Sequence, residues 1–146
     1  MKKKVSPLAL LSFVMVINAL SYGTIIPLLY PYASRFGVSP LGMSFLFASF
    51  SLAQFFSILG RLSDKFGRKP ILVICLLGTS LSLGTFALAN NFFILFVSRF
   101  IDGITGGNVS VAQAIISDTA KGADRAKAFG ILGASFGFGF IFGPAL

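Results

Sequence analysis

The sequence predicts an all-α integral membrane protein that crosses the bilayer five times. Hydrophobic residues make up 55% of the 146 residues, and the mean hydropathy is +0.91. Charged residues make up only 11%, whereas a water-facing domain usually carries about 25%. Apolar segments long enough for membrane helices follow one another along the chain. Lipid must therefore cover much of the surface.

Five apolar segments are expected to be the membrane-spanning helices. Each has about 19 to 25 residues, enough for a helix rising about 1.5 Å per residue to cross a core about 30 Å thick. We assign them approximately to residues 7–29, 41–59, 71–89, 92–116 and 128–146, which together form one partial transmembrane domain, residues 1–146. The last segment ends without a polar flank, so we expect it to belong to a longer bundle.

The basic residues predict a cytoplasmic N-terminus, because cytoplasmic connections of membrane proteins are enriched in lysine and arginine. In that orientation only Arg35 lies outside. A cleaved signal peptide is the alternative for the first segment, but its apolar run is long and four more segments follow. The cytoplasmic set is Lys2, Lys3, Lys4, Arg61, Lys65, Arg68, Lys69, Lys121, Arg125 and Lys127.

Composition excludes several classes of function. The net charge of +8 lies in short connections rather than on one continuous face, which argues against a nucleic-acid partner. The sequence has no histidine and no glutamate, so a metal site or an acid–base enzyme would depend on four aspartates. Cys75 is alone and is expected to be a packing residue. We expect no metal, no cofactor and no enzymatic activity.

The connection over residues 60–70 carries more than a topology signal. Gly60 is expected to allow close helix approach, Gly67 to supply a positive φ for a sharp reversal, and Pro70 to fit the first turn of the next helix. Asp64 is a lone acid among bases. It is expected to face a helix N-terminus or to pair with a nearby arginine.

The fourth segment contains Arg99 and Asp102, the charged residues inside the predicted spans. Intramembrane charges usually face a bundle interior or a wet cavity, and their i,i+3 spacing makes these two neighbours. The pair is either a structural ion pair that orients the helix or a site of proton or substrate coupling. Gly103 and Gly107 lie at helical spacing and are expected to allow close packing.

Asp118 follows at the cytoplasmic end of the fourth segment. A carboxylate there opposes the helix C-terminal dipole unless a base such as Arg68 or Arg125 offsets it. A solvated carboxylate without a partner is the alternative.

Polar and small residues in other segments complete the candidates. Asn18 and Tyr22 share a face of the first segment and, with Gln54, are candidates for substrate contact. For Asn18 and Tyr22, interhelical packing and an interfacial aromatic remain the alternatives. In the fifth segment Gly139 and Gly143 permit close packing, and Pro144, next to Gly143, is expected to bend the helix.

These motifs resemble the major facilitator superfamily. Residues 60–69 match its signature loop, G-x-L-(S/A/G)-D-(K/R)-(F/Y)-G-R-(K/R), at every position. Arg99, Gly103 and Gly107 are similar to its fourth-helix motif, and Gly139, Gly143 and Pro144 to the pattern of drug/proton antiporters. The likeness is greatest to the tetracycline/proton and multidrug antiporter branch. Asn18 and Ser82 stand where tetracycline antiporters carry acids, and Asp102 is an additional acid, which argues against tetracycline as substrate.

The resemblance implies five helices of a six-helix N-terminal half, within a twelve-helix transporter that works by alternating access. Its partners would be the lipid bilayer, protons, a small molecule and the missing C-terminal half. It also implies a location in the plasma or inner membrane and export of small amphiphilic molecules. Asp64, Arg68 and Asp118 would belong to a cytoplasmic gate, and Arg99 with Asp102 to proton coupling. A non-transporting membrane subunit and a small homo-oligomeric pore remain the alternatives.

Overall fold

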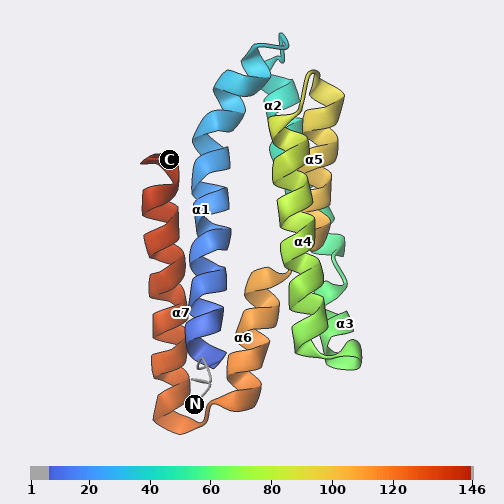
Figure 1. Ribbon diagram of the computed structural model, residues 1–146. Coiled ribbons are helices and arrows are strands. Elements are labelled where there is room, and N and C mark those ends of the chain that lie inside the picture. Colours follow the sequence, from blue (N-terminus) through green and yellow to red (C-terminus); the bar gives the residue numbers. More distant parts are fainter. Residues whose placement is uncertain (1–6, 146) are drawn as a thin grey trace. The chain divides into compact units, whose positions relative to one another are not determined.

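The computed structural model describes residues 7–145, which are almost entirely helical (Figure 1). Within this range five helical stretches are long and apolar enough to cross a membrane, which confirms the predicted fold class. The positions of Lys2, Lys3 and Lys4 and the end of the fifth segment at residue 146 lie outside the described residues. The elements are α1 (Pro7–Ser34), α2 (Pro40–Phe56), α3 (Leu59–Phe66), α4 (Arg68–Ala87), α5 (Phe92–Thr105), α6 (Asn108–Thr119), α7 (Gly122–Phe142) and the 3-10 turn η1 (Gly143–Ala145).

Several helices extend beyond their approximate predicted bounds, because apolar runs mark the membrane core rather than the ends of hydrogen-bonded helices. The first helix continues through two prolines to Ser34, and the third runs over Arg68–Ala87. The fifth begins at Gly122, with a φ of +53°, inside the predicted polar link. Its first turn contains Asp124, an acid that suits a helix N-terminus.

Two spans that were predicted as continuous helices are interrupted. The second breaks at Ser57 and Ile58, between α2 and α3, and the fourth breaks at Gly106 and Gly107, between α5 and α6. Glycine is a poor helix former, which explains the second break. The Ser57 hydroxyl, at the first break, donates a 2.6 Å hydrogen bond to the Ile104 carbonyl, near the second. A side chain at one break thus satisfies a backbone acceptor near the other.

The predicted connection over residues 60–70 is also mostly helical. α3 runs through it to Phe66, and Gly67 alone leaves the helix, at a φ of +97°. The positive φ expected at Gly67 is therefore present. Pro70 lies in the first turn of α4, as expected.

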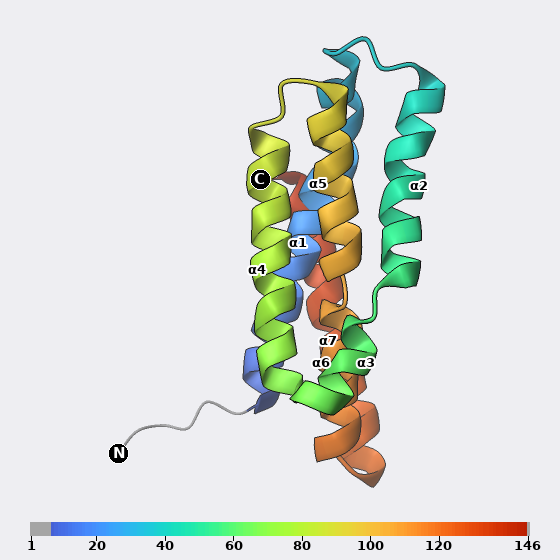
Figure 2. The same cartoon turned by 90° about the vertical axis from the view of Figure 1, so that its right-hand side faces the viewer.

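The chain divides into two compact units, which are described separately. In the unit Ile26–Val111, α5 packs against both α2 and α4 and lies between them in Figure 2. Side-chain caps begin two of these helices: Ser39 accepts from the Gly42 amide at 3.2 Å, and Asn91 accepts from the Ile94 amide at 2.9 Å.

The other unit contains the described residues through Ile25 and from Ala112 onward. Here α7 lies along α1, as Figure 1 shows. Gly139 faces the Val16 carbonyl, and Gly143 faces the backbone of Gly23, so both glycines bring the two helices close together. The Thr24 hydroxyl donates to the Gly143 carbonyl at 2.9 Å. The helix tightens to a 3-10 turn at Gly143, next to Pro144.

Candidate functional site

The strongest candidate site is the ion pair of Arg99 and Asp102 on α5. Arg99 Nη1 lies 3.3 Å from Asp102 Oδ2, and the two side chains are only 5% and 4% exposed. Their i,i+3 spacing puts them on one side of the helix, as predicted. Charged side chains that are buried this deeply need a partner, because burying an isolated charge has a very large free-energy cost.

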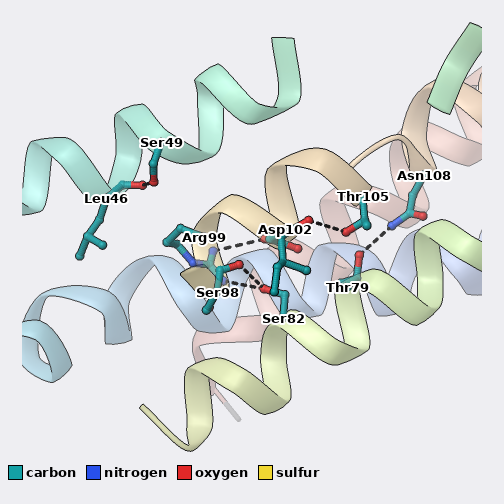
Figure 3. Close-up of polar contacts among 10 residues, drawn as sticks. Leu46, Ser49, Thr79, Ser82, Ser98, Arg99, Asp102, Thr105 and Asn108 are labelled. Carbon is teal, nitrogen blue, oxygen red and sulfur yellow. Dashed lines mark hydrogen bonds and ion pairs between the residues drawn. The ribbon is translucent and has the colours of Figure 1, made fainter. Parts of the chain in front are cut away.

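Residues of α4 hold the arginine from the other side. Arg99 Nη2 donates to Ser82 Oγ at 3.4 Å, and Ser82 in turn donates to the Ser98 carbonyl at 2.8 Å. The Phe86 ring lies one turn further along α4, with its centroid 5.4 Å from the guanidinium carbon. Figure 3 shows Ser82 directed at Arg99 across the seam between α4 and α5. The guanidinium is thus held by a carboxylate, a hydroxyl and a ring face.

A second polar contact lies further along α4, between α4 and α6. Asn108, the first residue of α6, donates through Nδ2 to Thr79 Oγ1 of α4 at 3.2 Å. Both residues are buried, Asn108 completely. Figure 3 shows this contact beyond Asp102 and Ser82 along the two helices.

The turn at Gly67 brings Asp64 and Arg68 together. Arg68 Nη1 lies 2.5 Å from Asp64 Oδ1 and 2.7 Å from Ser63 Oγ, so an arginine is the partner of the acid. The predicted close helix approach at Gly60 is wrong for the described residues, because a Cβ there would meet nothing within 4 Å. Among the described residues, no other helix comes close enough at this glycine to pack against it.

Asp118 is exposed near the end of α6. Arg125 of α7, one of the two bases predicted near it, donates through Nη2 to the hydroxyl of the adjacent Ser117 at 2.8 Å. The base therefore lies at the end of α6 where the carboxylate opposes the helix dipole.

The proposed substrate residues lie in different surroundings. Asn18 is 2% exposed, and its Oδ1 has no hydrogen-bond partner among residues 7–145. Tyr22 lies one turn further along α1, with its ring 6.5 Å from that of Phe136 on α7. Gln54 is exposed on α2. Asn18 and Tyr22 thus form one local set on α1, and Gln54 belongs to the other unit.

The packing role predicted for the fourth-segment glycines is supported. A Cβ on Gly103 would collide with the Phe50 carbonyl and the Ala53 side chain of α2. A Cβ on Gly107 would lie 3.3 Å from Leu59 and 3.4 Å from the Cys75 sulfur. Cys75 is buried, as expected of a packing residue.

Sequence reasoning did not identify the α4 side of this site. Thr79, Ser82 and Phe86 occupy one face of α4 at helical spacing, and the two hydroxyl residues three positions apart in an apolar helix were the available signal. Ser82 was noticed only because it stands where an acid was expected. Asn108 was missed because asparagine after two glycines is typical of turns. Among the described residues, no group of three or more His, Cys, Asp and Glu side chains could hold a metal ion.

Five apolar spans, one of which carries a buried ion pair that contacts α4, define a multi-pass helical membrane protein. The family model of the Major Facilitator Superfamily matches residues 11–146, and the chain belongs to this family. Its members are transporters rather than enzymes, in agreement with the prediction of no enzymatic activity.

Curated relatives agree with this assignment. The chain is 41% identical over 116 residues to the class B tetracycline resistance protein of Escherichia coli. The aligned region covers 78% of this chain and 27% of the relative. It is 39% identical over 137 residues to the class H protein of Pasteurella multocida, covering 90% of the chain and 34% of the relative. The chain thus spans about a third or less of the length of these two relatives.

The fold is also similar to a solved structure. The crystal structure of the human organic anion transporter MFSD10 matches with a TM-score of 0.84 and 25% identity, and the match covers 94% of this chain and 40% of that one.

Proposed function

We propose that this chain supplies the first five spans of a twelve-helix secondary transporter that exports small amphiphilic molecules in exchange for protons. The two curated relatives are named tetracycline resistance proteins, and the solved relative is named an organic anion transporter, which supports a small-molecule substrate. The protein lies in the plasma or inner membrane with its N-terminus in the cytoplasm. The C-terminal half of the transporter, protons, substrate and lipid are its partners.

The buried pair of Arg99 and Asp102 carries this proposal. With the fourth span at Phe92–Thr119, Asp102 lies about 5 Å and Arg99 about 10 Å from the middle of the span, at about 1.5 Å per residue. A charge pair at that depth is rare in membrane proteins and marks an ion or substrate pathway.

Asp102 is the proton carrier of the pair, and Arg99 adjusts its proton affinity. The arginine remains protonated throughout, so it stabilises the ionised carboxylate but does not carry the proton itself. Protonation of Asp102 removes its attraction to Arg99 and leaves the guanidinium with Ser82 and Phe86 on α4. The strength of contact between α4 and α5 then changes with the protonation state, which couples the proton to movement of the helices.

The remaining candidates act in the cytoplasmic gate and along the substrate path. Asp64, Arg68 and Asp118 belong to the cytoplasmic gate, with Gly60 and Gly67 flanking the α3 turn that carries Asp64. Asn18, Tyr22 and Gln54 contact the substrate. Because Asn18 and Ser82 are neutral, the substrate need not be tetracycline.

Replacement of Asp102 by asparagine tests the proposal. In the full-length transporter that carries this segment, Asp102→Asn is expected to abolish proton-driven uptake into inverted vesicles while substrate binding and energy-independent exchange continue. Asp124→Asn is the matched control, because it removes the same charge from an exposed position in the first turn of α7. Reduced folded yield with transport per folded molecule still driven by protons would show that the pair is structural.

A further inference from the structure

Two aromatic rings connect the buried ion pair to the far end of α1. The Phe86 ring, whose centroid lies 5.4 Å from the guanidinium carbon of Arg99, also stacks on the ring of Tyr32, with the two centroids 5.3 Å apart. Phe86 is buried, and side chains in a close-packed interior pass a displacement on to their neighbours. A movement of the guanidinium therefore changes the contact between Phe86 and Tyr32.

The hydroxyl group of Tyr32 fastens the same end of α1 to the end of α4. It lies 3.1 Å from the Ala87 carbonyl oxygen and 3.2 Å from that of Ala89, and it donates to these acceptors. Ala87 is the last residue of α4, where backbone carbonyls have no partner within the helix. Tyr32 thus contacts α4 in two ways, through the Phe86 ring and through the carbonyls at the helix end.

The backbone of α1 contains positions at which this end can bend. Pro27 and Pro31 lie inside the helix, and a proline there removes a backbone hydrogen bond and favours a kink. The boundary between the two compact units falls between Ile25 and Ile26, next to Pro27. The segment from Ile26 to Ser34, which is the outer end of α1 in the proposed orientation, therefore belongs to the unit of α4 and α5.

The charged groups around these rings are few. Among the described residues, α2 has no charged side chain, and those of α4, Arg68 and Lys69, lie at its opposite end. Arg35 follows the end of α1, with its guanidinium carbon 5.7 Å from the centroid of the Tyr32 ring, and it remains protonated. The charge of Asp102 is therefore the one that the proton cycle changes in these surroundings.

We propose that the stack of Phe86 on Tyr32 is the connection through which the charge of Asp102 controls the outer end of α1. A proton from outside binds the Asp102 carboxylate, which then stops attracting the guanidinium of Arg99. The cation binds the Phe86 ring more strongly, the stack on Tyr32 is stabilised, and the outer end of α1 is held against α4. When the proton leaves, the guanidinium returns to the carboxylate, and α1 bends outward at Pro27. This connection rests on the proposed function of Asp102.

Thiol labelling in a cysteine-free full-length transporter tests the connection. Ala33 has 0% exposure, so a cysteine there reacts with a membrane-impermeant maleimide only when the outer end of α1 moves away. In alkaline medium, which favours the ionised acid, Asp102→Asn should slow this reaction about 2- to 10-fold, the range expected for one aromatic contact. Phe86→Leu should remove the difference between Asp102 and Asp102→Asn, because leucine has no ring face. Phe86→Tyr, which keeps the ring, should retain it.

The neighbouring position supplies the control. Ser34, the next residue of α1, is exposed, so Ser34→Cys should react at the same rate in every background. If Ala33→Cys does not fold, Leu29→Cys replaces it, because Leu29 is buried one turn earlier on the same helix.

The outcomes separate this inference from the proposed function. If the rings serve only as packing, Phe86→Leu would speed the reaction equally with Asp102 and with Asp102→Asn, and this unchanged ratio would overturn the connection. Equal reaction rates in the parent and Asp102→Asn, with proton coupling lost in the variant, would also overturn it and leave Asp102 as the carrier. Proton-driven transport that survives in Asp102→Asn would overturn the proposed function itself.

Discussion

Arg99 on α5 donates to Ser82 on α4 across 3.4 Å, almost the same distance as the 3.3 Å to Asp102 on its own helix. The guanidinium therefore contacts a side chain on each of two helices, and of these two side chains only that of Asp102 carries a charge. A carboxylate at position 82 would lie within reach of the same arginine.

Exchange of the residues at these two positions should move the carrier from α5 to α4. We expect Asp102→Ser to lose proton-driven transport and the double variant Ser82→Asp/Asp102→Ser to regain a measurable part of it. In Ser80→Asp/Asp102→Ser the new acid is on the exposed face of α4, so transport should not return. Proton-driven uptake into inverted vesicles measures all three. Equal activity of the two double variants would contradict the arginine-centred site.

The Gly67 turn gives the second prediction. Asp64→Asn should impair transport while membrane insertion stays normal, because the partner of Arg68 loses its charge. Arg68→Lys should be milder than Arg68→Ala, since lysine keeps the charge but lacks the guanidinium, whose Nη1 contacts both Asp64 and Ser63. Lys69→Ala, exposed beside Arg68, is the control. Normal transport by Asp64→Asn would reduce this segment to a topology signal.

Thiol labelling tests the orientation of the spans. In a Cys75→Ala background, cysteines at Arg35 and Asn91 should react with membrane-impermeant reagents added to intact cells, and a cysteine at Lys65 should not. The three positions are exposed in the structure, so a failure to react reports the membrane barrier rather than burial. Reaction at position 65 would reverse the orientation and remove Asp64 from the cytoplasmic gate.

The sequence predicted the spans because lipid imposes a strong physical requirement. A helix in hydrocarbon must be apolar over most of its length, and five such segments are readable without any structure. The same reasoning found Arg99 and Asp102, since a charge in an apolar segment is conspicuous. It failed at Gly106–Gly107 because apolarity does not report where a helix unwinds.

Hydroxyl groups and small residues were the harder features to interpret. Ser82 can satisfy its hydroxyl within its own helix or across to another, and sequence does not distinguish the two. Glycines show the same ambiguity. A Cβ at Gly78 would collide with Thr105 of α5, whereas a Cβ at Gly84 on the same helix would meet nothing within 4 Å. Such differences depend on which helix faces which, information that one sequence does not contain.

The glycines of α7 allow a direct test of close packing. The glycines occupy two kinds of position: Gly139 faces α1, whereas Gly130, Gly133 and Gly137 have open space where a Cβ would lie. A Cβ on Gly139 would collide with the Val16 carbonyl and approach Ala19 Cβ to 2.8 Å and the Leu20 amide nitrogen to 3.1 Å. Two of these neighbours are backbone atoms, so α7 would have to move away from α1.

Gly139→Ala should therefore lower the stability, whereas Gly133→Ala should not. Alanine favours the helix over glycine by up to about 1 kcal/mol at either position. At Gly139 the overpacking cost, about 1–3 kcal/mol, should exceed that gain and lower the midpoint of thermal unfolding in detergent by several degrees. Gly133→Ala, with no neighbour to displace, should leave the midpoint unchanged or raise it. Because both variants share the propensity change, the difference between them isolates the contact with α1, and equal midpoints would show that Gly139 does not pack there.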